Sequence, residues 1–177
     1  SDLKGITDFA KDFSIPCVGG KVSFYNETPK GPIKPTPLIG VLGLIDKKPL
    51  RPQKIAKGDI LLIVGETKDE LGGSEYYEYI HKFIGGKSPA VDFKASKKNM
   101  KTVLSVIKKD LVKAAHDPSK GGLAVAISEL CMMNKIGCNV SLNKIPSKTL
   151  ESVRKMFSET HSRYLIVAEK RSEEHTS

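Results

Sequence analysis

An apolar run at Asp59–Val64, with the sequence D-I-L-L-I-V, limits the fold of this chain more than any other feature. Five apolar residues in a row predict a strand that is buried on both faces, because a strand with one face in water alternates apolar and polar residues. Helical patterns follow, and Tyr164–Glu169 predicts a last strand. A strand, three helices and a strand in this order predict an α/β layered domain.

Each of the three helices between these strands is predicted to begin at a serine. A serine hydroxyl can accept a hydrogen bond from an N–H group in the first turn of a helix. The second helix keeps its apolar residues three and four positions apart, which is the spacing of one helical face. A strand over Asn139–Leu142 and a short helix over Ser147–Phe157 are predicted to follow. The predicted helices run from Ser74 through Phe83, from Ser96 to about Ala115, and from Ser119 through about Asn134.

Gly121 and Gly122 fall in the first turn of the third predicted helix, where glycine is costly for helix propensity. One explanation is the close approach of another backbone, or of an anion at the helix N-terminus. The other explanation is tight packing of the helix itself. The sequence leaves both explanations open.

The N-terminal part of the chain combines one helix with extended segments. Apolar residues of Ser1–Phe13 follow a helical stripe, which Ser14–Ile15–Pro16 breaks. Four prolines and a glycine predict a loop over Thr28–Pro37. Pro49–Gly58 has the composition of a linker and is predicted to contain a domain boundary. Strands are predicted at Cys17–Val18, Val22–Tyr25 and Leu38–Ile45.

The stretch Val18–Thr28, V-G-G-K-V-S-F-Y-N-E-T, is the main candidate for a binding site. Its two glycines let backbone N–H groups approach a ligand closely. Lys21 and Ser23 alternate, so they point to one side of an extended strand. A glycine-rich turn with a lysine and a hydroxyl suits a phosphorylated ligand. The alternative is an ordinary glycine turn that leads into a strand.

The charge balance allows several partners. Lys and Arg number 29 against 20 Asp and Glu, which gives a net charge of +9. Such a balance suits nucleic acid, a phosphorylated small molecule, or only a basic surface. The lysines between Lys97 and Lys113 fall mostly on one solvated helical face, and no aromatic ladder interleaves with them. A nucleic-acid-binding module is therefore suggested by net charge alone.

Three cysteines, Cys17, Cys131 and Cys138, form neither a C-x-x-C pair nor an even disulfide set, and their apolar surroundings predict buried, reduced thiols. No apolar run reaches about 18 residues, and no signal-peptide pattern occurs, so we expect a soluble, cytoplasmic protein that does not bind membranes. The first helix is expected to be already in progress at Asp2. Arg171–Ser177 is expected to be a non-native tail.

Four blocks in order resemble the synthetase subunit of phosphoribosylformylglycinamidine synthase. That family typically has V-S-G-N-V-S-L-Y-N-E-T followed by P-T-P-x-I-G-M-V-G-L at the position of the first block. The departures from this pattern that bear on ligand binding are Gly19, which replaces the usual serine, and Lys21, which replaces the asparagine. The four blocks are Val18–Asp46, Glu70–Tyr76 (E-L-G-G-S-E-Y), Ala115–Ala126 (A-H-D-P-S-K-G-G-L-A-V-A) and Phe157–Leu165 (F-S-E-T-H-S-R-Y-L).

The resemblance implies an α/β (α+β) fold with two lobes. Residues 1–52 would be the C-terminal remainder of a PurM-like N-terminal-type, nucleotide-binding lobe. Residues 53–170 would be a PurM-like C-terminal-type lobe of mixed sheet with packed helices, and residues 171–177 the non-native tail. The catalytic histidine and most magnesium ligands of the family lie in a half that this chain does not contain. No catalytic residue is therefore expected here, and the chain alone is expected to be inactive.

The resemblance also implies the reaction. The family uses ATP and Mg²⁺ to activate the formamide oxygen of formylglycinamide ribonucleotide, and ammonia then gives the amidine in purine biosynthesis. A glutaminase subunit supplies the ammonia, and a small bridging subunit completes the complex. No nucleic acid is expected as a partner. Strand edges left unpaired by the missing half favour self-association.

Three residues of the first block correspond to family ligand contacts. Gly20 matches the glycine that contacts ATP, and Ser23 matches the serine that contacts the ribonucleotide. Lys21 takes the place of the asparagine that ligates magnesium. An ammonium has no lone pair for a metal, so metal binding at Lys21 is in doubt, but its charge can lie against the phosphates. The alternative for Lys21 is an exposed charge beside a turn.

Asp117 is the best metal candidate of the second lobe. The family usually has H-D-V-S-D-G-G here, and the equivalent aspartate of its first half ligates magnesium at the primary site. This second site is auxiliary, and Lys120 replaces the second acid, which weakens the metal prediction. Without the resemblance, His116–Asp117 is more simply a helix-capping turn. Glu159, Thr160 and His161 are expected to serve the auxiliary site or strand entry.

Other functions remain open at this point. Aminoimidazole ribonucleotide synthase, selenophosphate synthetase and thiamine-phosphate kinase belong to the same superfamily, although the blocks S-F-Y-N-E-T and E-L-G-G-S-E-Y argue against them. A basic nucleic-acid-binding module is the alternative that is not an enzyme. A degenerate, purely structural half would explain Lys21 and Lys120.

Overall fold

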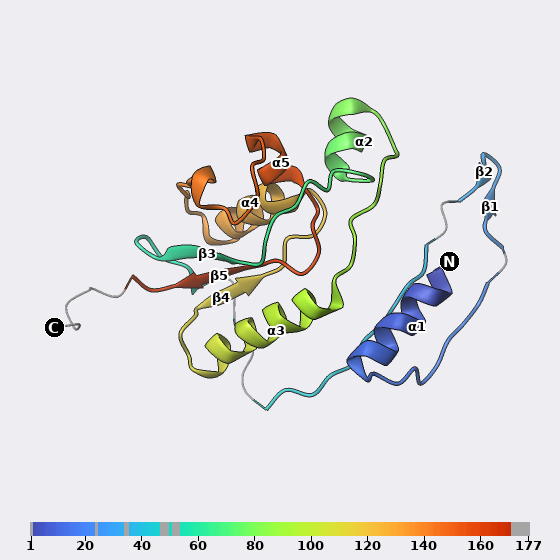
Figure 1. Cartoon of the computed structure of the whole chain (residues 1–177), viewed down its shortest axis with the longest axis horizontal. Coiled ribbons are helices and arrows are strands. Elements are labelled where there is room, and N and C mark those ends of the chain that lie inside the picture. Colours follow the sequence, from blue (N-terminus) through green and yellow to red (C-terminus); the bar gives the residue numbers. More distant parts are fainter. Residues whose placement is uncertain (1, 24, 34–35, 47–49, 51–53, 171–177) are drawn as a thin grey trace. The chain divides into compact units, whose positions relative to one another are not determined.

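The structure is a computed structural model that describes residues 2–23, 25–33, 36–46, 50 and 54–170. The chain divides into two units, Ser1–Lys47 and Lys48–Ser177, and each is described by itself (Figure 1). Helices and small antiparallel sheets make up the described part, which confirms the α/β (α+β) class.

The first unit begins with helix α1, Asp2–Phe13, which confirms the predicted helix. Phe9 and Phe13 stack at 4.5 Å between ring centroids. The helix ends because Ser14 takes a left-handed conformation with φ 54°, and the Ile15 N–H then donates to the Ala10 carbonyl at 2.9 Å. This pattern of bonds is the common way to satisfy the last carbonyls of a helix.

A two-residue hairpin follows, made of β1 (Glu27–Thr28) and β2 (Gly31–Pro32). The Thr28 hydroxyl donates to the Gly31 carbonyl at 3.1 Å, and Gly31 has a positive φ of 113°, which glycine tolerates without strain. From Thr28 onward, the hairpin lies inside the segment that we predicted as a loop. That part of the prediction was wrong, because side-chain bonds of the turn hold the strands rather than an apolar pattern.

The strands predicted for the first unit are not formed in its described residues. Cys17–Val18 and Leu38–Ile45 have no strand conformation, nor have the described residues of Val22–Tyr25, since residue 24 lies outside the description. Apolar side chains of the third segment are open to solvent, with Leu38, Leu42 and Leu44 at 97–98% exposure. A strand forms only beside a partner strand, and the described part of this unit offers none to these segments.

The second unit is built on a three-stranded antiparallel sheet with the order β3-β5-β4. Strand β5, Tyr164–Ala168, lies in the centre, and it pairs along its whole length with β3, Ile60–Val64. Strand β4, Ala114–His116, pairs with the other edge of β5. The predictions at Asp59–Val64 and Tyr164–Glu169 are confirmed as strands, whereas β4 was not predicted.

Helices cover both faces of this sheet (Figure 1). Leu165 and Val167 of β5 belong to a core cluster with α4 (Gly122–Asn134), and Met156 of α5 (Ser152–Phe157) packs against it. Ile166 belongs to a second cluster with Val103 of α3 (Phe93–Lys108). Alternate residues of the central strand therefore hold the two helical layers.

Strand β3 is less buried than its apolar run predicts. Ile60 and Leu62 are 40% and 46% exposed, whereas Leu61 and Ile63 pack against the α4 core. The difference arises because β3 is an edge strand, and of its residues on this face the cluster with Val103 of α3 includes Val64 but not Ile60 or Leu62.

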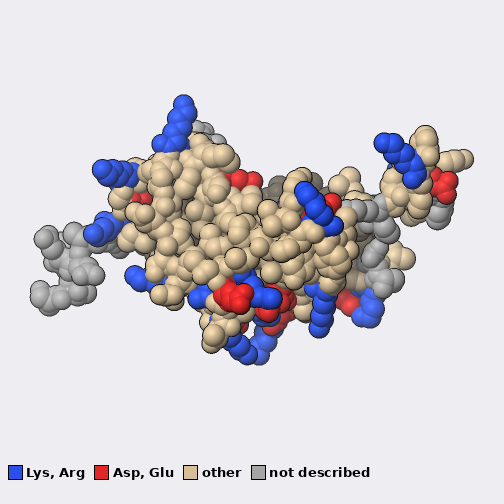
Figure 2. Space-filling view, turned by 90° about the horizontal axis from the view of Figure 1, so that it is seen from above, with Lys and Arg blue, Asp and Glu red and all other residues tan. Residues whose placement is uncertain are grey.

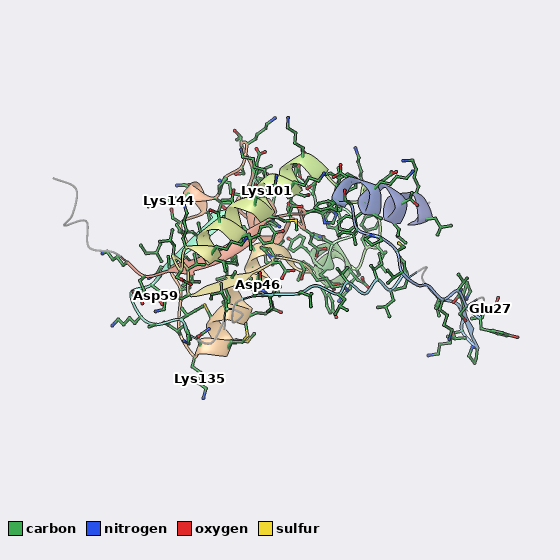
Figure 3. All side chains as sticks on the ribbon, turned by 90° about the horizontal axis from the view of Figure 1, so that it is seen from below. Glu27, Asp46, Asp59, Lys101, Lys135 and Lys144 are labelled. Carbon is green, nitrogen blue, oxygen red and sulfur yellow. The ribbon has the colours of Figure 1, made fainter. Side chains whose placement is uncertain are left out.

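Asp59, labelled in Figure 3, fixes the start of β3. Its carboxylate accepts from the Ala56 N–H at 2.8 Å and pairs with Lys113 Nζ at 2.9 Å, just before β4. Burial raises the pKa of the Asp59 carboxyl, but the bonds from Ala56 and Lys113 outweigh it and lower the pKa overall. The ion pair thus ties the beginnings of the two edge strands together.

Two helix boundaries differ from their predictions. Helix α2, Glu75–His81, has the predicted cap Ser74, but it ends at His81 because Lys82 adopts a left-handed conformation. Helix α3 is capped by Asp92, whose carboxylate accepts from the Ala95 N–H at 2.9 Å. The predicted cap Ser96 lies inside that helix instead, and its hydroxyl donates to the Asp92 carbonyl.

The end of α3 and the segments near α4 also differ. Helix α3 ends at Lys108, because Asp110 is left-handed and the chain then extends into β4. Helix α4 is capped by Gly121 rather than Ser119, whose carbonyl accepts from the Gly122 N–H. The strand predicted at Asn139–Leu142 is absent, and a short 3₁₀ turn, Leu142–Lys144, follows that segment.

Gly122 shows why two glycines begin α4. A Cβ on Gly122 would lie 2.6 Å from the Ser158 carbonyl oxygen and 2.8 Å from that of Met156. Both glycines also have positive φ, 76° at Gly121 and 65° at Gly122. The close approach of another backbone is therefore the explanation that the structure supports for Gly122.

We expect Gly122→Ala to lower the free energy of unfolding by about 3 kcal/mol, because the new methyl group meets backbone and the backbone conformation is strained. Urea unfolding followed by circular dichroism measures the change. Gly137→Ala is the matched control, since a Cβ there meets no described atom within 4 Å. Equal stability of the two variants would contradict the close approach.

Candidate functional site

The three ligand residues predicted in the first unit lie in an extended, exposed segment. Gly20, Lys21 and Ser23 are all exposed, and the Asn26 side chain donates to the Ser23 carbonyl at 3.2 Å. A Cβ on Gly19 or Gly20 would meet no atom within 4 Å among the described residues. The backbone at both glycines is therefore open to a ligand, although the structure does not gather these residues into a cavity.

Lys21 does not fit a metal site. Its ammonium offers three N–H donors and no lone pair. Within the described ranges, no group of three or more His, Cys, Asp and Glu side chains is placed to hold a metal ion. The residues present here fit the phosphates of a nucleotide, which are anions, but not Mg²⁺.

The residues His116 and Asp117 do not form a helix cap. His116 ends β4, and its Nε2 lies 2.8 Å from Glu129 Oε2 on α4. Its Nδ1 lies 3.8 Å from Asp117 Oδ1. The interpretation as a capping turn was wrong, because the imidazole joins a strand to a helix. The Asp117 side chain is 73% exposed and belongs to no described metal-ligand cluster.

Glu159 supplies the anion at the start of α4. Its Oε1 accepts from the Gly121 N–H at 2.8 Å and from the Glu75 N–H of α2 at 2.9 Å. A negative charge is favourable there, because the first N–H groups of a helix have no partner inside it. The carboxylate thus links the beginnings of two helices through a single oxygen.

Lys120 stands where the family has a second acid, and it pairs with Glu75 on α2. The Lys120 Nζ lies 2.7 Å from Glu75 Oε1. The hydrogen bond from Lys120 to this carboxylate raises the pKa of Lys120. Lys120 therefore supplies a contact between α2 and the residues that lead into α4.

Arg163 is the most buried charged side chain of the described core, with 1% exposure. Its guanidinium donates to the carbonyls of Thr160 and Ser158 and, at 3.0 Å, to the Thr67 hydroxyl. Burial lowers the pKa of Arg163 to about 10, and Glu70 and Glu159 partly oppose this. Sequence reasoning missed this residue, and its place in the F-S-E-T-H-S-R-Y-L block was the one available signal.

The E-L-G-G-S-E-Y block holds the segment that precedes α3. Glu70 Oε1 accepts from the Ala90 N–H at 3.0 Å. A Cβ on Gly72 would lie 2.0 Å from the Lys87 carbonyl oxygen, so only glycine fits there. Glu70 Oε2 is buried and has no hydrogen-bond partner in the described part of the chain. The contacts of this block therefore hold residues 87–90 in position.

A pocket of about 1060 Å³ opens between β3, α4 and the segment that follows α4. Its walls are mainly apolar, and they include Leu61, Ile127 and Ile136. Cys131 and Cys138 line the same pocket. None of the ligand residues predicted from the sequence belongs to it.

The cysteines correct one expectation. Cys17 and Cys138 are exposed and Cys131 is half-buried, so the prediction of three buried thiols was wrong, although none of the three is in a disulfide.

Lys and Arg are scattered over the face shown in Figure 2 rather than gathered in one patch. In Figure 3, Lys135 at the end of α4 lies apart from Lys101 on α3. None of the described helices is both long and apolar enough to cross a membrane.

Comparison with known proteins finds one family and a consistent set of relatives. The sequence model of the family described as "AIR synthase related protein, C-terminal domain" matches residues 56–176. The phosphoribosylformylglycinamidine synthase subunit PurL of Methanocaldococcus jannaschii is 45% identical over 172 residues, which are 93% of this chain and 24% of that protein. The chain thus spans about a quarter of the length of the curated relatives it matches.

Solved structures of PurL from Thermotoga maritima are similar in fold. The complex with FGAR superposes with a TM-score of 0.57 and 25% identity, over 72% of this chain and 21% of that one. The complex with ATP and the PurLQS assembly each have a TM-score of 0.50 at 25% identity, over 72% and 71% of this chain and 19% of each of those chains.

Replacing Glu159 tests its role at the two helix starts. We expect Glu159→Ala to lower the free energy of unfolding by about 2 kcal/mol, because two buried N–H groups lose a charged acceptor. Glu159→Gln keeps one acceptor oxygen and is expected to cost less than half of that. Urea unfolding measures both, with Glu151→Ala as the control, since that side chain is 84% exposed. A Glu159→Ala variant as stable as the control would refute the link.

Proposed function

The chain belongs to the family of AIR synthase related proteins, and from this premise we propose that it is part of a phosphoribosylformylglycinamidine synthase. One observation carries the proposal: 45% identity to a PurL subunit, sustained over 93% of this chain. The two lobes would fall at residues 1–52 and 53–170. The shared superfamily alternatives, aminoimidazole ribonucleotide synthase and selenophosphate synthetase, have no comparable match among the relatives reported above.

The proposed reaction is the ATP-dependent conversion of formylglycinamide ribonucleotide and ammonia to formylglycinamidine ribonucleotide. ATP supplies a phosphoryl group that turns the formamide oxygen into a leaving group. Catalysis of such a transfer rests on positioning and on stabilising the charge of the oxygens. This chain contributes binding groups to that task, and the proposal assigns it no catalytic residue.

Gly20, Lys21 and Ser23 are the proposed binding groups. The open backbone at Gly20 allows its N–H to approach a phosphate, and the Lys21 ammonium neutralises phosphate charge. The Ser23 hydroxyl would contact the ribonucleotide. Most Mg²⁺ ligands would come from the half of the enzyme that this chain does not contain, since Lys21 does not fit the ion. At Asp117, the structure offers a single exposed carboxylate to an auxiliary metal site.

The proposed setting is the cytoplasm, in a complex with a glutaminase subunit and a small bridging subunit. The solved PurLQS assembly of Thermotoga maritima supports a multi-subunit arrangement in this family. The scattered lysines of Figure 2 lend no support to a nucleic-acid partner.

A chimeric enzyme tests the proposal. The matched 172 residues of this chain replace the corresponding segment of Methanocaldococcus jannaschii PurL. We expect ATP hydrolysis that depends on formylglycinamide ribonucleotide and ammonia, within about tenfold of the parent enzyme. Ser23→Ala in the chimera is expected to raise KM for the ribonucleotide about tenfold. A chimera that folds, as judged by circular dichroism and gel filtration, but has no such activity would overturn the proposal.

Lys21 has a separate prediction in the same chimera. We expect Lys21→Gln to raise KM for ATP about tenfold, because a cation beside the phosphates is lost. The dependence on Mg²⁺ concentration should stay the same, since the ammonium cannot ligate the metal. Lys30→Gln, in the β1–β2 turn, is the control. An unchanged KM for ATP would show that Lys21 is only an exposed charge.

A further inference from the structure

Two of the three cysteines meet at the wall of the pocket in the second unit. Cys131 lies on α4, and Cys138 lies in the segment that follows this helix. Both line the pocket between β3 and α4, and the Cys131 thiol is one of the groups that raise the pKa of the Cys138 thiol. The proposed function uses neither of them.

The end of α4 brings these side chains together. Lys135 adopts a left-handed conformation with φ 52°, and its N–H donates to the Met132 carbonyl at 3.2 Å. The next N–H, of Ile136, donates to the Cys131 carbonyl at 3.1 Å. These two bonds form the motif that reverses the chain at a helix end. Because residue 136 is held against residue 131, Cys138 returns to the side of the helix that carries Cys131.

The surroundings of the pair leave it accessible. Cys138 is exposed and Cys131 is half-buried, so a small oxidant can reach the first thiol while the second stays beside it. Within the described ranges the two thiols belong to no group of three or more His, Cys, Asp and Glu side chains that could hold a metal ion. The third cysteine, Cys17, belongs to the other unit of the chain.

We propose that Cys131 and Cys138 are a dithiol oxidation site, which forms an intramolecular disulfide with a low-molecular-weight disulfide such as oxidised glutathione. One thiolate attacks a glutathione sulfur, which forms a mixed disulfide and releases one glutathione. The second thiolate then attacks the protein sulfur of this mixed disulfide and releases the second glutathione. The two protein thiols lose two electrons and two protons, and the glutathione disulfide gains them.

The disulfide changes the wall of the pocket. It closes a ring from Cys131 to Cys138 that contains the reversal at the end of α4, and so it fixes Ile136 and its neighbours to the helix. A covalent link of this kind removes conformations from the segment that borders the pocket. Oxidation would thus stiffen one wall of the pocket while leaving the sheet pairing of β3 and β5 intact.

The ionisation of Cys138 sets the conditions for the experiment. Burial, and then the neighbouring Cys131, raise the pKa of the Cys138 thiol above its usual value. Thiolates are the attacking species, so exchange is slow at neutral pH and faster in mild alkali. An incubation at about pH 8.5 is therefore suitable.

The test uses the whole chain with Cys17→Ser, which removes the unpaired thiol. After incubation with oxidised glutathione, intact-mass measurement should show a loss of about 2 Da, no glutathione adduct, and no free thiol. Peptide mapping should find Cys131 joined to Cys138, and dithiothreitol should restore both thiols. In the double variant Cys17→Ser/Cys131→Ser, the reaction should stop at a mixed disulfide on Cys138, about 305 Da heavier.

Three results would overturn the proposal. They are stable glutathione adducts on both cysteines of the Cys17→Ser protein, disulfide-linked dimers as its main product, and no reaction under conditions that oxidise a free dithiol peptide. Circular dichroism of each variant shows that it is folded before oxidation. Serine is close to cysteine in size, and the serine variants keep every backbone bond at the end of α4.

Discussion

The segment that leads into the central strand β5 holds the second unit together. Ser158 Oγ accepts from the Glu70 N–H at 3.2 Å, Glu159 binds the starts of α2 and α4, and buried Arg163 donates to Thr67. Strand β5 then pairs with both edge strands and sends alternate side chains into the two cores. A polar segment and the apolar strand that follows it in sequence thus contact most of the other helices and strands of the second unit. Replacing one buried bond in such a network leaves its partner unsatisfied, which costs more than the bond itself contributes.

Local signals predicted the elements that depend on neighbouring residues. The stripe of α1, the Ser74 cap of α2 and the apolar run of β3 are all encoded within a few residues, and the structure contains each of them. Strand β4 was missed because it has three residues and its pairing with β5 joins parts of the chain about fifty residues apart. The same limit explains why Leu38–Ile45 was predicted as a strand: its composition suits a strand, but pairing requires a partner that local sequence does not specify.

The residues of the candidate site also differ in whether their role depends on neighbouring residues or on the fold. Gly20, Lys21 and Ser23 were identified by resemblance, and their chemistry follows from residue type alone. Arg163 could not be recognised from the sequence, because its burial depends on the fold, which brings Thr67 from a distant part of the chain to its guanidinium. For Glu159, the sequence suggested strand entry or an auxiliary site, whereas its bonds to two helix starts depend on the fold. The sequence pattern therefore proposed residues for ligand binding and missed those that satisfy the protein's own polar groups.

The two glycine pairs of this chain illustrate that difference. A side chain at Gly122 would meet backbone carbonyl groups, and one at Gly121 would meet the Val125 side chain. The N–H of Gly121 is already bonded to Glu159. An incoming phosphate would have to displace a carboxylate that is part of the folded chain. At Gly19–Gly20, no described atom lies where a Cβ would be, and the adjacent Lys21 is exposed. A glycine pair can bind an anionic ligand only where its backbone is unoccupied, so the phosphate-binding role that we propose fits the first pair, and the second pair has a structural role.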